Sequence, residues 1–121
     1  MNRFINSLGF AWQGIRKAFS EQRNLKFHFS AAFAVVAAGF YFEITAEEWM
    51  VLVLTIGFVV TLELMNTAME ELVNLLSPHH QPKAGKIKDI AAGAVLIAAI
   101  TSVIIGFQIF HKYVFNWIHS L

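Results

Sequence analysis

Residues 90–110 read IAAGAVLIAAITSVIIGFQIF and carry no charged side chain over 21 positions. A helix that crosses a bilayer needs about 20 apolar residues, so this stretch is long enough to span a membrane. The whole chain of 121 residues agrees, since 57% of it is hydrophobic and 14% is charged, against about 45–50% and 25% in soluble domains. The sequence therefore predicts an all-α membrane protein, argues against a soluble enzyme and excludes a disordered chain.

Two earlier stretches are also candidate spans. Residues 27–42 are apolar or small except for two polar side chains, and residues 49–62 are uncharged before a helical pattern that continues to residue 76. We expect spans at about residues 25–43, 49–76 and 88–111. The second would be about 42 Å long at 1.5 Å per residue, so its C-terminal part should emerge from a hydrocarbon core of about 30 Å into water. The run SPHHQP at 77–82 should then break the helix.

Residues 2–22 have the pattern of an amphipathic helix. Apolar side chains recur at helical spacing, at Phe4, Leu8, Trp12, Ile15 and Phe19, and the polar ones lie mostly opposite, at Asn2, Asn6, Gln13, Arg16 and Lys17. Such a helix is expected to lie in the membrane interface, beside the three spans of a single domain that covers residues 1–121. The alternative, a core helix of a soluble bundle, fits poorly beside three spans.

The basic residues predict how the chain is oriented. Eight of the nine Lys and Arg residues precede the first span or lie between the second and third, whereas the loop at 43–48 has three acids and no base. Because basic loops stay in the cytoplasm, we expect a cytoplasmic N-terminus and an extracytoplasmic C-terminus. The net charge of +1 gives no indication of nucleic-acid binding. The lack of cysteine excludes a disulfide or a thiol nucleophile.

A polar stripe on the second span is the first candidate for chemistry. Glu63, Asn66 and Glu70 are spaced i, i+3 and i+7 and share one helix face, which Asn74 extends. Glu63 lies roughly 21 Å along the helix from residue 49, which places it about 10 Å inside the cytoplasmic boundary of the membrane. An intramembrane carboxylate is a functional hypothesis, and the alternative is that it holds helices together. Since three helices hardly bury such a stripe, a homo-oligomer is implied.

A basic segment at the start of the third span could complete a site. Lys88 and Asp89 are expected beside a helix N-terminus, where a cation can hold phosphate, although positive-inside signalling alone would also explain the lysine. Together with Glu70 they suggest an anion and a metal at the interface. His79 and His80 are expected to be solvated in a turn, and His28 is expected to face the headgroups, where it is uninformative alone.

The runs ELMNTAME at 63–70 and KDIAAGA at 88–94 resemble the prokaryotic diacylglycerol kinase family, which consists of small trimeric lipid kinases of the membrane. The resemblance covers nearly the whole chain. Arg23-Asn24 and the His-His turn resemble the Gram-positive branch, whose members phosphorylate undecaprenol. The resemblance implies a homotrimer in a bacterial plasma membrane that uses MgATP and a lipid alcohol.

The resemblance also implies roles for individual residues. Glu63 matches the general base, and Glu70 matches a ligand of the Mg²⁺ that accompanies ATP. The nucleotide-binding positions are Arg3, Asn66, Glu70, Lys88 and Asp89. The lipid-binding positions are Trp12, Arg16, Asn24 and Glu63.

One position departs from the family. The residue directly before Arg23-Asn24 is normally a metal-binding Glu, but here it is Gln22, which Glu21 precedes. One residue turns a side chain by about 100° around a helix. Either Glu21 or Gln22 could complete the metal site, and Glu21 is favoured because Mg²⁺ prefers charged oxygen.

The predicted function is therefore phosphorylation of undecaprenol to undecaprenyl phosphate at the expense of ATP. The alternative acceptor is diacylglycerol, which would give phosphatidic acid. The alternative from another class is a small oligomeric transporter that uses Glu63 as a proton or cation site.

Overall fold

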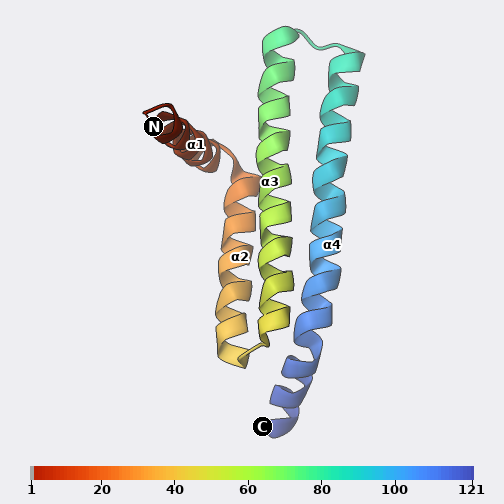
Figure 1. The fold of residues 1–121 in the computed structure, drawn as a ribbon. Helices are drawn as coiled ribbons and strands as arrows, with labels where there is room; N and C mark the ends of the chain where they lie inside the picture. Colours follow the sequence, from red (N-terminus) through yellow and green to blue (C-terminus); the bar gives the residue numbers. More distant parts are fainter. Residues whose placement is uncertain (1) are drawn as a thin grey trace.

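The computed structural model describes residues 2–121 and consists of four helices in this part of the chain. Their bounds are α1 Asn2–Glu21, α2 Arg23–Phe42, α3 Ala46–Leu76 and α4 Pro82–Ser120. In Figure 1, α2, α3 and α4 run side by side with alternating direction, and α1 projects at an angle from the start of α2. The last three helices are long and apolar enough to cross a membrane. The predicted all-α fold with three candidate spans is confirmed.

A single residue separates α1 from α2. Gln22 has an extended backbone, with φ −107° and ψ 117°, so Glu21 is the last residue of α1. The helix expected over residues 2–22 is therefore one residue shorter. The rotation of about 100° between adjacent helical residues does not describe Glu21 and Gln22, because the helix is broken between them.

The turn between α2 and α3 is tight and fully bonded. Glu43 adopts the left-handed conformation, with φ 52° and ψ 55°, and its N–H donates to the carbonyl of Phe40 at 3.3 Å. The N–H of the next residue, Ile44, donates to the carbonyl of Gly39 at 3.1 Å, which completes a Schellman motif. Ile44 is buried and anchors the turn to the core.

Helix α3 begins with a capping box that also reaches α4. The Glu48 N–H donates to Thr45 Oγ1 at 3.1 Å, and the Thr45 N–H donates to Glu48 Oε1 at 3.0 Å. The same carboxylate accepts a hydrogen bond from the Tyr113 hydroxyl and pairs with Lys112 Nζ at 3.0 Å. These contacts fasten the first turn of α3 to the C-terminal part of α4.

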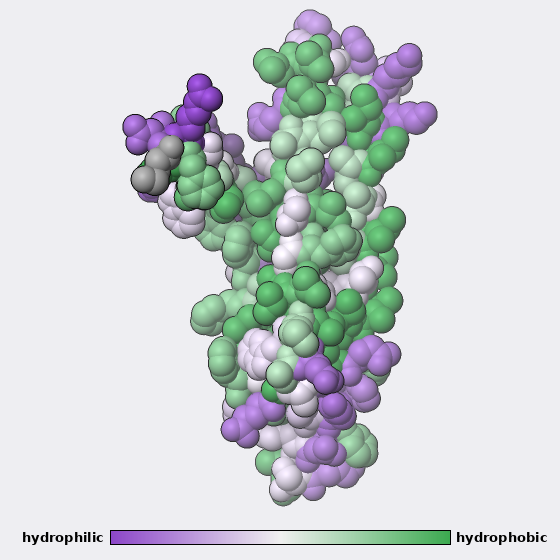
Figure 2. Space-filling model, viewed as in Figure 1, coloured by the Kyte–Doolittle hydropathy of each residue, from purple (hydrophilic) through white to green (hydrophobic). Residues whose placement is uncertain are grey.

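Few side chains are buried within a single chain. The core cluster of Ile44, Leu52 and Ile109 sits where α2, α3 and α4 meet near the Glu43 turn. Large apolar side chains on the long helices stay exposed, such as Phe33 at 79% and Leu54 at 74%. On the face seen in Figure 2, hydrophobic residues occupy the middle of the bundle and hydrophilic residues gather at both ends. This distribution suits a hydrocarbon solvent for the middle of the bundle.

Gly39→Ala is expected to destabilise the fold by about 1–3 kcal/mol, because a Cβ at this position would crowd the core. That atom would lie 2.7 Å from Trp49 Cη2 and 3.2 Å from Ile44 Cδ1. Thermal unfolding in detergent measures the effect. Gly9→Ala is the control, since nothing lies within 4 Å of a Cβ there. An unchanged unfolding temperature for Gly39→Ala would contradict the close packing of α2 on Trp49.

Candidate functional site

The polar stripe lies on the long middle helix of the bundle, as its spacing predicts. Glu63 is buried at 3% exposure, although it belongs to an otherwise apolar part of α3. Asn66 follows three residues later on the same face, and its Nδ2 donates to Glu70 Oε1 at 3.1 Å. Asn66 Oδ1 is buried and has no hydrogen-bond partner within residues 2–121. The stripe thus presents a buried carboxylate followed by an amide–carboxylate pair with an oxygen free to bind a ligand.

Glu63 has a partner that the sequence analysis missed. His28 on α2 places Nε2 2.9 Å from Glu63 Oε1, and the two side chains are 18% and 4% exposed. His28 is uninformative alone in the sequence, and only the packing of α2 against α3 places it beside the stripe. The available signal was composition, since His28 is the one acidic or basic residue in residues 27–42.

A groove of about 540 Å³ separates the N-terminal helix from α3. Small side chains open it, including Gly14, Ala18 and Ala68, and Glu21 and Lys17 line it from α1. Glu21 therefore faces α3 across the groove. The structure places this carboxylate beside the helix that carries the stripe, although its neighbours in the groove are Thr67 and Glu71.

The basic segment lies on a helix rather than before one. Helix α4 begins at Pro82, which is well placed at the first helical position because its ring fixes φ. Lys88 and Asp89 therefore lie in the second turn, with Lys88 partly buried and Asp89 exposed. The expectation that these residues sit beside a helix N-terminus is wrong, because the free N–H groups of α4 belong to the turn that starts at Pro82.

The remaining predicted site residues are on the surface. All are exposed, and none is joined to the stripe by a side-chain hydrogen bond in the part of the chain that the structure describes: Arg3, Trp12, Arg16 and Asn24. The first three lie on α1 and Asn24 lies in the first turn of α2. A single chain thus brings together Glu63, Asn66 and Glu70, and leaves these four positions facing outward.

The oxygen atoms of the stripe are of the kind that could hold a magnesium ion. Within residues 2–121, no three His, Asp or Glu side chains lie close enough to hold a metal ion. Mg²⁺ in phosphoryl-transfer sites is commonly held by one or two carboxylates, with phosphate oxygens and waters as the other ligands. Glu70 and the unpaired Asn66 Oδ1 are hard oxygen donors of this kind.

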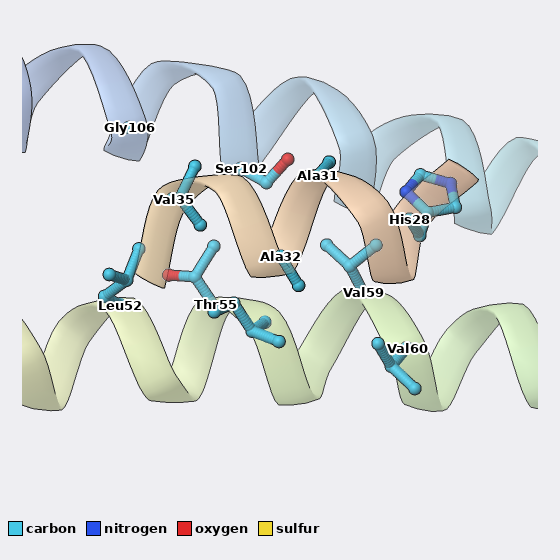
Figure 3. A pocket seen from close by; sticks show the side chains of 11 residues that line it. His28, Ala31, Ala32, Val35, Leu52, Thr55, Val59, Val60, Ser102 and Gly106 are labelled. Atoms are coloured by element: carbon cyan, nitrogen blue, oxygen red, sulfur yellow. The ribbon is translucent and has the colours of Figure 1, made fainter. Parts of the chain in front are cut away.

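An apolar cavity of about 100 Å³ lies between α2, α3 and α4. Figure 3 shows His28 at one end of this cavity, and Val35, Leu52 and Gly106 at the other. The cavity extends from His28, the partner of Glu63, into the apolar part of the bundle.

Comparison with known protein families identifies the family to which this chain belongs. The family model described as prokaryotic diacylglycerol kinase matches residues 9–110. The chain belongs to the prokaryotic diacylglycerol kinase family. The matched segment contains the whole stripe, His28 and the Lys88-Asp89 pair, whereas Arg3 lies outside it.

Several curated proteins are similar over most of the chain. An undecaprenol kinase of Bacillus subtilis (strain 168) is 46% identical over 110 residues, which cover 91% of this chain and 89% of that protein. A diacylglycerol kinase of Synechocystis is 44% identical over 83% of this chain and 58% of its own length. A diacylglycerol kinase of Escherichia coli (strain K12) is 28% identical over 84% of both chains. The protein is thus a membrane-associated lipid kinase with ATP as co-substrate, and similarity to the Gram-positive undecaprenol kinase branch is confirmed.

Proposed function

We propose that the protein transfers the γ-phosphoryl group of ATP to undecaprenol, giving undecaprenyl phosphate and ADP, at the cytoplasmic face of a bacterial plasma membrane. The observation that carries this proposal is the buried Glu63 on a membrane-length helix, with the Asn66–Glu70 pair following it on the same face. This spacing suits a lipid hydroxyl in the membrane and a phosphate at its edge. The similarity to an undecaprenol kinase supports this acceptor.

The reaction needs a base that accepts the hydroxyl proton and a γ-phosphate held in position. Glu63 accepts the proton of the lipid hydroxyl as the oxygen attacks the γ-phosphorus. The bond from phosphorus to the β–γ bridging oxygen breaks, and ADP leaves with that electron pair. Catalysis rests mainly on positioning and on stabilisation of the charge of the transferred group.

Glu70 would hold the Mg²⁺ of MgATP, with Asn66 Oδ1 beside it. The ion would neutralise negative charge on the phosphates. The second protein ligand is Glu21 or Gln22, and Glu21 is favoured because it is charged and lies in the groove against α3.

Nucleotide and lipid contacts come from the exposed positions. Arg3, Lys88 and Asp89 would bind ATP together with Asn66 and Glu70. Trp12, Arg16 and Asn24 would bind the lipid alcohol, and α1 would form one wall of its path. The exposed apolar side chains of α1, such as Phe4 at 67% and Trp12 at 63%, support a helix that lies in the membrane interface.

The active unit would be a homo-oligomer, most simply the trimer that the resemblance implies. Exposed apolar side chains on all three long helices leave ample surface for contact between copies. The orientation would be N-terminus inside, which puts the α3–α4 turn in the cytoplasm. The ninth basic residue, Lys112, would then lie outside, where it is paired with Glu48.

Diacylglycerol is the second candidate acceptor, since similar proteins carry that name. A transporter that uses Glu63 is the rival from another class. Purified protein in liposomes decides between the classes with two assays, one for ³²P transfer from ATP to extracted lipid and one for proton or cation flux without ATP. We expect labelled lipid and no flux. Flux without any labelled lipid would overturn the kinase proposal.

A further inference from the structure

Two ionisable side chains, the basic His28 and the acidic Glu63, lie in the apolar parts of the long helices. Residues 27–42 contain His28 alone of this kind, residues 49–69 contain Glu63 alone, and residues 90–110 contain none. The fold brings the two together, with 2.9 Å between His28 Nε2 and Glu63 Oε1. The contact joins α2 to α3 and is independent of the hydrogen bond between Asn66 and Glu70.

The cavity beside His28 offers Glu63 no competing hydroxyl donor. The cavity beside it is lined by apolar side chains such as Ala32, Val59 and Val60. Its two hydroxyl groups are already bonded to their own helices, Thr55 to the carbonyl of Val51 and Ser102 to the carbonyl of Ala99. A hydrogen bond to a carboxylate gains strength where water is scarce and no other donor competes.

We propose that His28 is a positioning residue of the phosphoryl-transfer site. Its Nε2–H holds Glu63 Oε1 and thereby turns Oε2 toward the acceptor hydroxyl. The inference rests on the proposed function, in which Glu63 accepts the hydroxyl proton. A carboxylate on a flexible side chain needs such a second anchor, because a displacement of about 1 Å can cost about 100-fold in rate.

The alternative is a purely structural role, in which His28 only offsets the cost of burying the Glu63 carboxylate within the membrane. The structural role needs only some polar partner for Glu63, whereas positioning needs a hydrogen-bond donor at the place that His28 Nε2 occupies. Gln carries its Nε2 donor as many bonds from Cβ as His28 does, and Asn is one bond shorter. His28→Gln and His28→Asn therefore have the same chemical group and differ in reach.

The test compares kcat and KM of these variants, per folded oligomer, in lipid nanodiscs with undecaprenol and MgATP. We expect His28→Asn to lower kcat about 100-fold with little change in the KM for ATP, and His28→Gln to recover at least tenfold of that loss. Ser30→Ala on the exposed side of α2 is the control and should keep the wild-type kcat. Equal kcat values for the two variants, or a wild-type kcat for His28→Asn, would overturn the positioning role.

A spectroscopic measurement tests the contact without activity. The chain has five histidines, and His28→Gln identifies the His28 signals in protein labelled with ¹⁵N-histidine. Glu63→Gln should shift the His28 Nε2 resonance, and Glu47→Gln at the exposed start of α3 should not. An unshifted resonance would overturn the proposal. If wild-type protein phosphorylates no lipid at all, the proposed function fails. If it does and His28→Asn keeps its kcat, only the positioning role fails.

Discussion

Glu63→Gln is expected to lower phosphoryl transfer to lipid by about 10²–10⁴-fold and to leave the oligomer intact, because it removes the base and keeps the shape of the side chain. The amide oxygen of Gln can still accept the hydrogen bond from His28, so the contact between α2 and α3 survives. The rate is measured as ³²P transfer to undecaprenol in nanodiscs, and assembly is measured by size exclusion in detergent.

The matched control for Glu63→Gln is Glu47→Gln, which neutralises an exposed carboxylate in the first turn of α3. It should keep the wild-type rate. The rival explanation is that Glu63 holds helices of the oligomer together. That explanation predicts dissociation of Glu63→Gln on size exclusion, with the specific activity retained in the oligomer that remains. This pattern would remove Glu63 from the chemistry.

Glu70→Ala is expected to raise the Mg²⁺ concentration for half-maximal rate by at least about tenfold, or to abolish transfer. The variant removes a charged oxygen ligand, and even changes around a metal site commonly cost 10–100-fold in affinity. It also leaves Asn66 Nδ2 without the acceptor that it has now. A Mg²⁺ titration of the initial rate measures the effect, and an unchanged titration curve would exclude Glu70 as a ligand.

The second protein ligand can be found in the same titration. If Glu21 completes the site, Glu21→Gln should resemble Glu70→Gln, and adding Gln22→Glu to it should restore activity. A silent Glu21→Gln, together with a large gain from Gln22→Glu in the wild-type background, would show that the natural site is incomplete.

The fold class was predictable because the membrane imposes a length and a composition on each span. The stripe was predictable for a similar reason, since spacing along one helix places Glu63, Asn66 and Glu70 on one face whatever the neighbours are. The local breaks in the helical backbone were not predictable from the sequence. Nothing in the sequence pattern around Gln22 distinguishes an extended residue from a helical one. Glu43 adopts a left-handed conformation that is uncommon for a non-glycine residue.

Contacts between helices were the least predictable. The pairing of His28 with Glu63 depends on the register of α2 against α3, which side-chain packing sets. The start of α4 shows a second limit. Charged residues at 83–89 mark where the apolar segment begins, but the helix continues beyond it to Pro82, since a helix need not end at a membrane boundary.

If this protein phosphorylates undecaprenol, that lipid should prevail over diacylglycerol when the two compete as acceptors. Purified wild-type protein in nanodiscs is given [γ-³²P]ATP and Mg²⁺ with equal amounts of undecaprenol and diacylglycerol, and the labelled lipids are separated by chromatography. We expect most of the label to appear in undecaprenyl phosphate. Label mainly in phosphatidic acid would contradict the acceptor, and label in neither lipid would contradict the function.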